Sequence, residues 1–338
     1  MKENSKFKEF DSMLAKWTST TLGRKQFLAS IPLLLAACNS SSNNRMREGD
    51  NTGQKTDMTP QDEARLTQEV LPQMQKDYPK IENPELQNYI QNLGQKIVKA
   101  NNLENNPYKY SFTVVGVNYV NAFALPAGTV FVTAPLLAMA GSEAELAGVV
   151  GHEIGHIQAR HTAERMQAAK DSESSMWIFG GVGALIGGGT GYLAASKLCP
   201  PKDDSCIAAY TVAGAAVGAA GGLLIQKYQF MANSREDEME ADRIGFKTAL
   251  NAGYSKAQIG KFYEKLLVME KEAKAGTNPL IASLSDAMST HPPSQERVDQ
   301  MNQMVAEASQ KGSGITSSAD FEKAQSLSTA WINSQSKA

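Results

Sequence analysis

Two histidines four residues apart, His152 and His156, are the residues whose type and spacing point most directly to chemistry. An α-helix turns about 100° per residue, so side chains four apart differ by only about 40° around its axis and reach the same point. Two imidazoles held in this way form half of a zinc site. Glu153 follows the first histidine, where its carboxylate projects beside the metal and accepts a proton from zinc-bound water. The spacing therefore predicts a zinc hydrolase.

The surrounding residues, 142–167, predict the helix that such a site needs. Ser142 and Glu145 have the spacing of a capping box at the helix N-terminus. The apolar positions that follow contain no proline, and they are Leu146, Val149, Val150, Ile154 and Ile157. The alternative is a chance match of the five-residue pattern, and this helical setting favours the metal site.

A third ligand is expected from an acidic cluster at residues 234–245, which we predict to begin another helix. In that helix Glu238 and Asp242 share a face, whereas Glu240 points roughly 200° away from Glu238. One carboxylate of the shared face would bind zinc while the other orients a ligand histidine, and spacing alone leaves their roles open. The alternative is a solvated acidic face, as most charge runs are.

Between Tyr108 and Thr133 the apolar residues recur with a period of two, which predicts strands. Pro126 and Gly128 disfavour a central strand, so the segment before them belongs at a sheet edge or in its turn. An edge beside a metal site binds extended peptide through backbone hydrogen bonds. The predicted substrate strand consists of Asn121, Ala122, Phe123 and Ala124. An ordinary hairpin without a ligand is the alternative.

The N-terminal residues 1–37 resemble a lipoprotein signal peptide. Basic residues precede a short apolar run, Phe27–Ala37, which is too short to span a bilayer as a stable helix. The run ends at Cys38 in a sequence that resembles a lipobox, so we expect Cys38 to carry a lipid anchor. An uncleaved anchor or a buried core segment is the alternative, and the sequence leaves open the Sec or the twin-arginine route of export.

Asn39, directly after the lipobox cysteine, bears on the membrane that would hold the anchor. An aspartate there would resemble the signal for retention at the inner membrane, so asparagine points to the periplasmic face of the outer membrane. The outer face of the inner membrane is the alternative location. Residues 38–58 are polar and predict a flexible tether between anchor and domain.

Residues 176–226 predict a glycine-rich helical hairpin, because two uncharged arms carry glycines at four-residue spacing. These are Gly183, Gly187, Gly191, Gly214, Gly218 and Gly222. Cys199 and Cys206 lie at its tip, where an oxidising compartment would join them in a disulfide, free cytosolic thiols being the alternative. A membrane-spanning hairpin would place that tip in the reducing cytosol. The cysteines therefore favour a hairpin that packs on the protein, on lipid or on another subunit of a homo- or hetero-oligomer.

Composition is that of an ordinary globular protein, with 42% hydrophobic and 20% charged residues in 338. Without residues 1–37 the chain has 27 basic and 32 acidic residues, a net charge of −5, and nothing indicates nucleic acid as a partner. Further helices are predicted at 60–78, 84–101, 256–274 and 294–307. The predicted catalytic domain spans 59–310, and 311–338 form a C-terminal tail.

Four signals in the expected order resemble peptidase family M48, the zinc metallopeptidases of the CAAX prenyl protease, HtpX, BepA and LoiP type. They are Asn121–Pro126, Ser142–His156, Ser234–Asp242 and Ser289–Pro292 with Arg297. The resemblance covers about half of the chain. One departure is Pro126-Ala127-Gly128, where the family usually has Pro-Gly-Gly.

The resemblance implies a mainly helical α+β fold of the gluzincin type, with a small edge-exposed β-sheet. It implies one zinc ion per chain, bound by His152, His156 and Glu238, with Asp242 as the partner of a ligand histidine and Glu153 as the catalytic base. LoiP-like lipoproteins are the nearer group, because the chain lacks the clear membrane spans of HtpX and the helical repeats of BepA.

The resulting hypothesis is an envelope endopeptidase that cleaves unfolded, damaged or misassembled polypeptides. Two alternatives remain: a chaperone-like, binding outer-membrane lipoprotein with a structural zinc, and a non-proteolytic zinc hydrolase such as an amidase. His291, in a proline-stiffened loop, would reach the open zinc position and hold the enzyme latent, or assist the transition state, or be a plain surface histidine. His161 lies about 180° around the predicted helix from His152, and we expect it to be structural.

Overall fold

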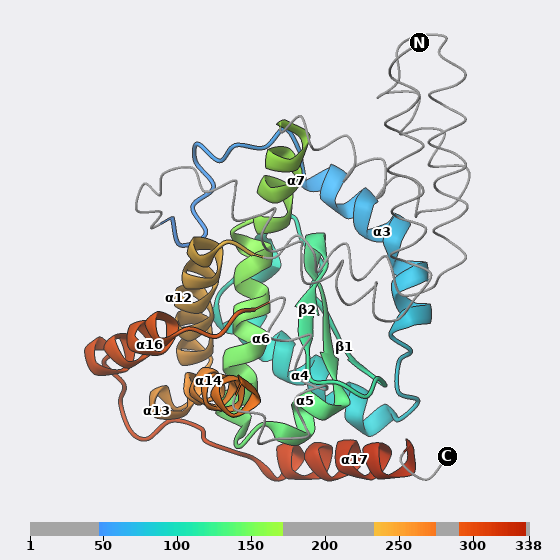
Figure 1. Cartoon of the computed structure of the whole chain (residues 1–338), viewed down its shortest axis with the longest axis vertical. Coiled ribbons are helices and arrows are strands. Elements are labelled where there is room, and N and C mark those ends of the chain that lie inside the picture. The colour runs from blue at the N-terminus through green and yellow to red at the C-terminus, as the bar shows by residue number, and fades with distance from the viewer. Residues whose placement is uncertain (1–46, 172–232, 275–290, 336–338) are drawn as a thin grey trace. The chain divides into compact units, whose positions relative to one another are not determined.

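The computed structural model describes residues 47–171, 233–274 and 291–335 (Figure 1). These residues belong to the second of two compact units, Met46–Ala338. The predicted signal peptide, the lipidation site Cys38, the glycine-rich hairpin and the cysteine pair Cys199 and Cys206 lie outside the described residues.

The first two described helices lie where the sequence predicts them. Helix α3, Pro60–Asp77, begins at a capping box formed by Thr59 and Asp62, and α4, Pro84–Ala100, begins at Asn83, whose side chain accepts from the Leu86 N–H. Helix α4 packs against strand β1, and the apolar side chains at helical spacing along it are buried: Leu86, Ile90, Leu93 and Ile97. A short 3₁₀ turn, Leu103–Asn105, follows.

The sheet has three strands in the order β1-β3-β2. Strand β1, Ser111–Val115, is parallel to β3, Thr129–Thr133, and β2, Ala122–Ala124, is antiparallel to β3. Strand β2 therefore lies at a sheet edge, as predicted, and a 3₁₀ turn at Pro126–Gly128 connects it to β3. Among the described residues, no strand pairs with the outer side of β2.

Two helices replace the single helix that the sequence predicts at 142–167. Helix α5, Ala134–Met139, is followed by α6, Glu143–Gln158, and α7, His161–Asp171. The helix is interrupted between α6 and α7 at Arg160, whose φ is +53°. The predicted cap is also only half present, because Ser142 accepts from the Glu145 N–H whereas the Glu145 carboxylate accepts from Gly141.

Helix α12, Arg235–Asn251, packs along α6, and α6 lies between α12 and the sheet (Figure 1). The backbones of the two helices approach closely at glycines. A Cβ atom at Gly245 would lie 2.6 Å from the His152 backbone nitrogen, and one at Gly151 would lie 2.7 Å from the Gly245 oxygen. This close contact brings the acidic first turns of α12 beside the two histidines of α6.

Four further helices follow α12 among the described residues. The predicted helix 256–274 is interrupted at Gly260 into α13, Lys256–Ile259, and α14, Lys261–Lys274. Helix α16, Gln295–Glu307, agrees with the prediction. Helix α17, Ala319–Gln335, does not, because the sequence predicted only a tail there; it packs against α5 and α4 and buries Phe321 and Ala324 (Figure 1).

Residues 47–57, within the predicted tether, contact the folded domain. Side chains in this segment donate to backbone carbonyls near the end of α6 and in α7: Asn51 to Gln158, Gln54 to Ala159 and Thr56 to Ala163, at 3.0, 2.7 and 3.2 Å. The last carbonyls of a helix lack partners within the helix, and the amides of Asn51 and Gln54 satisfy those of Gln158 and Ala159 at the end of α6. The folded domain therefore begins before residue 59.

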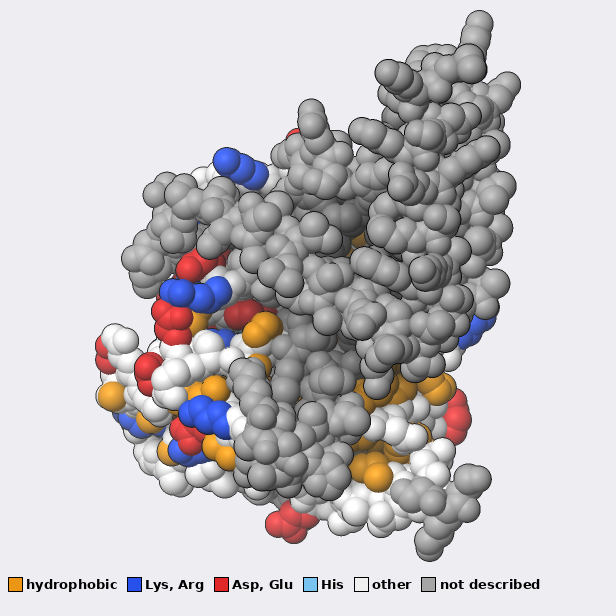
Figure 2. Space-filling view, in the orientation of Figure 1, with side chains coloured by type: hydrophobic (Ala, Val, Ile, Leu, Met, Phe, Trp, Pro, Cys, Tyr) orange, Lys and Arg blue, Asp and Glu red, His pale blue; other side chains and the backbone are white. Residues whose placement is uncertain are grey.

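Two apolar clusters lie about the sheet, a large one that includes α4 and α6, and a smaller one in which α3 packs on β2 and β3. In the smaller cluster the ring of Phe123 stacks on that of Phe131 and meets the ring of Tyr78 at 56°. On the described surface in Figure 2, basic and acidic side chains lie next to one another. Among the described residues, no helix combines the length and the apolar character that a membrane span requires.

Candidate metal centre

Four side chains converge on one point, and each offers a ligand atom within 4.8 Å of the others: His152, His156, Glu238 and His291. The Nε2 atoms of His152 and His156 are 2.9 Å apart, and each lies 3.3 Å from a carboxylate oxygen of Glu238. The structure thus brings the two histidines together with the third ligand that the resemblance implies. Two imidazole nitrogens and one carboxylate are a donor set that fits zinc.

Two helices, α6 and α12, supply three of the four side chains. Helix α6 supplies His152, Glu153 and His156, and every residue of α6 from Glu143 to Ile157 is buried. Helix α12 supplies Glu238 from its first turn, which Ser234 caps through the Asp237 N–H. His291 lies in the segment before α16.

His152 contacts a second carboxylate through the ring nitrogen that does not face Glu238. Its Nδ1 atom lies 2.8 Å from Oδ1 of Asp242, as the resemblance implies for the partner of a ligand histidine. Nε and Nη2 of Arg297 each lie 2.7 Å from an oxygen of the same carboxylate, and Nη1 lies 2.8 Å from Oε2 of Glu238. Arg297 is only 2% exposed, so one buried cation holds both acidic residues in place.

The protonation states of the buried groups suit a metal. Burial acts to raise the pKa of Glu238, but the charges of His291, Arg297 and His152 outweigh it and keep that pKa well below its ordinary value. Burial and the charge of His152 lower the pKa of His156, so its imidazole is neutral. Burial opposes a charge on His152, yet Glu238 and Asp242 raise its pKa to about 9. Metal binding would displace that proton.

Glu153 lies beside the four converging side chains and is not one of them. Its Oε1 atom lies 3.4 Å from Nε2 of His291, and the residue is 2% exposed. Burial raises the pKa of Glu153, partly offset by His291 and His152. A carboxylate of raised pKa is an effective general base near neutral pH.

His291 does not lie on the open surface. Its Nδ1 atom is 3.2 Å from both oxygens of Glu238 and 3.2 Å from Nε2 of His152. The hypothesis of a plain surface histidine is therefore wrong, while the gating and transition-state hypotheses both remain.

The predicted substrate strand lies next to the helix of the histidines, because β2 packs against α6. Asn121 precedes the strand: its N–H donates to Oγ1 of Thr133, and its carbonyl accepts from the Thr133 N–H. Ala122 and Phe123 are buried. Ala124 is half-buried at the end of the strand.

Sequence reasoning missed two residues of the centre. The sequence spacing predicts His161 on the opposite side of the helix from His152. The Nδ1 atom of His161 lies 2.8 Å from Nδ1 of His156, because the helix is interrupted at Arg160 and α7 starts in a new direction. Glu240, expected to point away from the site, lies 3.3 Å from Nε2 of His161. No glycine or proline occurs between His156 and His161 to signal the break.

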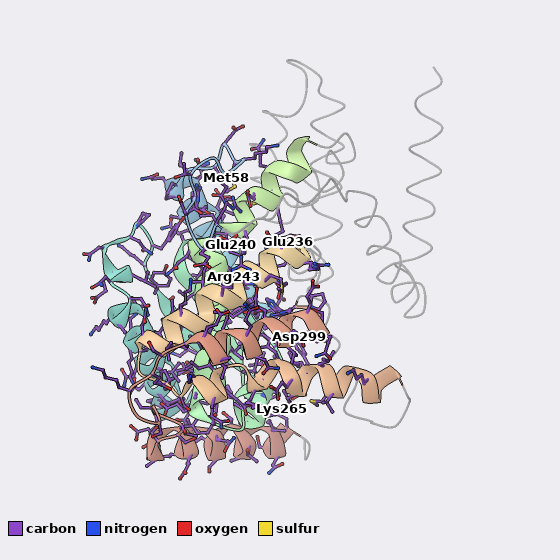
Figure 3. The ribbon with its side chains drawn as sticks, turned by 90° about the vertical axis from the view of Figure 1, so that its left-hand side faces the viewer. Met58, Glu236, Glu240, Arg243, Lys265 and Asp299 are labelled. Atoms are coloured by element: carbon purple, nitrogen blue, oxygen red, sulfur yellow. The ribbon has the colours of Figure 1, made fainter. Side chains whose placement is uncertain are left out.

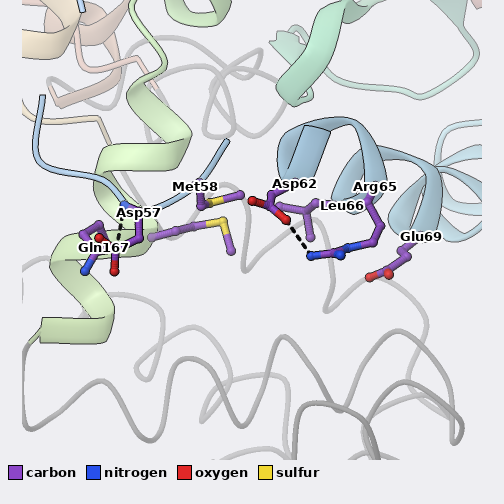
Figure 4. A pocket seen from close by; sticks show the side chains of 8 residues that line it. Asp57, Met58, Asp62, Arg65, Leu66, Glu69 and Gln167 are labelled. Atoms are coloured by element: carbon purple, nitrogen blue, oxygen red, sulfur yellow. Dashed lines mark hydrogen bonds and ion pairs between the residues drawn. The ribbon is translucent and has the colours of Figure 1, made fainter. Parts of the chain in front are cut away.

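A separate surface hollow lies between α3 and α7 (Figure 4). It is lined by Asp57, Met58, Asp62, Arg65, Leu66, Glu69, Met166 and Gln167. None of these residues belongs to the candidate metal centre.

The fold and the centre are those of a metallopeptidase, and comparison with known proteins identifies the family. Residues 84–305, about two thirds of the chain, match Peptidase family M48. The chain belongs to this family of zinc-dependent metallopeptidases, and the resemblance predicted from its four motifs is confirmed.

Three relatives indicate the range of similar proteins. The beta-barrel assembly-enhancing protease of Escherichia coli K12 is 27% identical over 239 residues, 69% of this chain and 43% of the relative. The mitochondrial metalloendopeptidase OMA1 of Arabidopsis thaliana is 31% identical over 62% of this chain and 35% of the relative. Metalloprotease LoiP of Escherichia coli K12 is 26% identical over 61% of this chain and 66% of the relative. The match thus spans less than half of the first two relatives.

Proposed function

We propose that this chain is a zinc-dependent endopeptidase that cleaves unfolded, damaged or misassembled proteins of the bacterial cell envelope. The observation that carries the proposal is the convergence of His152, His156 and Glu238, with Glu153 beside them. Membership of Peptidase family M48 supports the same reaction class.

In the proposed mechanism His152, His156 and Glu238 hold the zinc ion. A zinc ion bound there supplies a water molecule of lowered pKa and an electrophile for the peptide carbonyl. Glu153 accepts a proton from the attacking water at its carboxylate and donates it to the leaving amine. Asp242 contacts Nδ1 of His152, and Arg297 holds Asp242 through a bidentate ion pair. Because these groups are buried, we expect them to keep the His152 ring in position.

The substrate would bind along β2. An extended polypeptide adds to a sheet edge through its backbone, so binding depends little on side-chain sequence. This suits unfolded substrates, since a folded protein does not offer an extended segment. The strand residues proposed for this contact are Asn121, Ala122, Phe123 and Ala124.

The proposed location is the periplasmic face of the outer membrane, with the lipid anchor at Cys38; the outer face of the inner membrane is the alternative. Relatives named as a beta-barrel assembly-enhancing protease and as LoiP support an envelope location. We further propose a disulfide between Cys199 and Cys206, and oligomer contacts through residues 176–226.

The direct test is zinc content combined with cleavage of a denatured polypeptide such as reduced casein. We expect one zinc ion per chain, complete loss of cleavage after chelation, and recovery on addition of zinc. Cleavage that persists without zinc would contradict the proposal. Slower aggregation of the polypeptide without cleavage would favour the chaperone-like alternative, and cleavage of small amides alone would favour the amidase.

Replacing His291 by alanine tests the gating hypothesis. His291 contacts Glu238, His152 and Glu153, and thus occupies the side of the centre that substrate would need. If a contact worth about 1.4 kcal/mol holds it there, only about a tenth of the molecules are open, and His291→Ala should raise basal cleavage roughly tenfold.

The matched control for His291→Ala is Glu296→Ala, an exposed change on nearby α16 that should leave cleavage unaltered. A fall in kcat with unchanged zinc affinity would instead indicate that His291 assists the transition state. If neither basal cleavage nor zinc affinity changed, the gating hypothesis would be lost.

A further inference from the structure

Nδ1 of the predicted ligand His156 makes a side-chain contact that the proposed reaction does not use. Nδ1 of His156 lies 2.8 Å from Nδ1 of His161, and Nε2 of His161 lies 3.3 Å from Oε2 of Glu240. His161 and Glu240 both have 0% exposure. Two histidines and a carboxylate therefore form a continuous buried row that begins at the metal centre.

The direction of the hydrogen bonds in this row follows from the chemistry of the ligand. A histidine that binds metal through Nε2 carries its proton on Nδ1, so His156 donates and Nδ1 of His161 accepts. With Nδ1 of His161 accepting, its proton is on Nε2, which faces two carboxylates: Glu240 at 3.3 Å and Asp237 at 3.8 Å. Only one arrangement of protons satisfies every contact in the row, and it fixes both the tautomer and the ring orientation of His156.

Glu240 is in turn held by the N-terminal strap, which we define as residues 47–56. The Gly49 N–H donates to Oε1 of Glu240 at 2.9 Å, and Nη2 of Arg47 lies 3.7 Å from Oε2. Arg47 also makes a bidentate ion pair with Glu164 of α7 at 2.8 and 2.7 Å. A buried carboxylate needs such partners, because an unpaired buried charge is strongly unfavourable.

The strap is fixed to the same region at further points. Its side chains donate to the carbonyls of Gln158 and Ala159, which directly precede Arg160, the residue between α6 and α7 at which the chain turns toward His161. Glu48 contacts Arg243 and Lys247, which lie on α12 beyond Glu240. Figure 3 labels Glu240 and Arg243 on α12, and Met58 just beyond the strap.

The two ligand histidines are therefore supported by different means. His152 contacts Asp242, which a buried arginine of α16 holds. Nδ1 of His156 contacts His161, which in turn contacts the Glu240 carboxylate, and the arginine near that carboxylate comes from the strap. Partners of this kind raise ligand basicity and orient the ring, and their removal weakens metal binding about 10- to 100-fold.

We propose that His161 is a positioning residue for the zinc ligand His156, and that Glu240 and the docked N-terminal strap hold His161 in this role. The strap is thus part of the metal centre's support rather than a linker. This inference rests on the zinc site proposed above.

The first experiment measures zinc affinity by competition with a chromophoric chelator, and the thermal midpoint of the zinc-free protein, for the full mature chain. His161→Ala should weaken zinc binding about 10- to 100-fold. His161→Asn places an oxygen near the position of Nδ1 and should recover most of that loss. If the wild type binds no zinc, the proposed function fails; if it binds zinc and His161→Ala binds equally well, only this inference fails.

The second experiment tests the strap. Arg47→Ala should weaken zinc binding several-fold, whereas Arg65→Ala, at a side chain of α3 that is 66% exposed and pairs with Asp62, should not. The double variant Arg47→Ala/His161→Ala should lose less zinc-binding free energy than the sum of the losses in the two single variants, since both residues act through Glu240. Fully additive effects, or a fall in the zinc-free thermal midpoint with unchanged zinc affinity, would show that Arg47 and His161 are structural only.

Discussion

Replacing Glu153 by glutamine should lower kcat/KM for an unfolded polypeptide roughly 10²- to 10⁴-fold while one zinc ion stays bound per chain. Glu153 is outside the group of four converging side chains, and its Oε1 atom lies 3.4 Å from Nε2 of His291. Glutamine retains the size and burial of the side chain, but an amide cannot accept the proton of the attacking water.

The measurement is steady-state cleavage of a fluorogenic polypeptide together with zinc analysis of the same preparation. Glu236→Gln is the matched control, because it removes a negative charge from neighbouring α12 without touching the converging ligands. An unchanged rate in Glu153→Gln would remove the endopeptidase hypothesis. Loss of zinc from the variant would instead mean that Glu153 is a ligand and not the base.

The part of the centre that the sequence predicts is the part that local geometry determines. His152 and His156 share a face of α6 because four residues are about one helical turn, and Glu238 and Asp242 share a face of α12 for the same reason. Spacing could not separate the roles of the two carboxylates, and the implied roles depended on the family motif. The structure places Glu238 beside both histidines and Asp242 behind His152.

The support behind His156 could not be predicted, because it depends on a helix break that tertiary contacts produce. A helical wheel extended through Arg160 places His161 opposite His152. In the structure Arg160 has a positive φ and donates to Glu63 of α3 and to the Met58 carbonyl. Contacts between residues a hundred positions apart thus override the local preference for one helix.

The ends of the domain were missed for a related reason. The residues 47–57 are polar, and a polar segment is expected to be unfolded unless its side chains find specific partners. Its partners are the carbonyls near the end of α6, which no sequence pattern marks. In α17 few apolar residues, among them Phe321 and Ala324, make the contact with the core, so a Ser- and Ala-rich composition concealed the helix.

Replacing Arg297 by methionine should destabilise the zinc-free protein by about 3–5 kcal/mol, because it leaves two carboxylates without their buried cation. Arg297 bridges Asp242 and Glu238, donates to the Pro292 carbonyl and lies 4.7 Å above the ring of Tyr263. Methionine retains much of the length and apolar volume, so the loss reports the charge rather than a cavity.

The sign of the pH dependence follows from Asp242. Burial acts to raise the pKa of Asp242, but Arg297 and His152 outweigh it, and the pKa lies below that of an ordinary aspartate. This stabilisation is therefore complete above the pKa of an unfolded aspartate, about 3.9, and is lost as the pH falls through the lower folded value. Urea unfolding at pH 7 with a chelator present measures the whole difference.

The chain offers a matched control that joins the same two helices. Arg235 of α12 pairs with Glu296 of α16 at 2.6 Å, but these side chains are 64% and 47% exposed. Water screens such a pair, so Arg235→Met should cost no more than about 1 kcal/mol. If both variants lost the same small amount, Arg297 would not be holding Asp242 and Glu238. The centre would then depend on the packing of α6 and α12 at Gly151 and Gly245 alone.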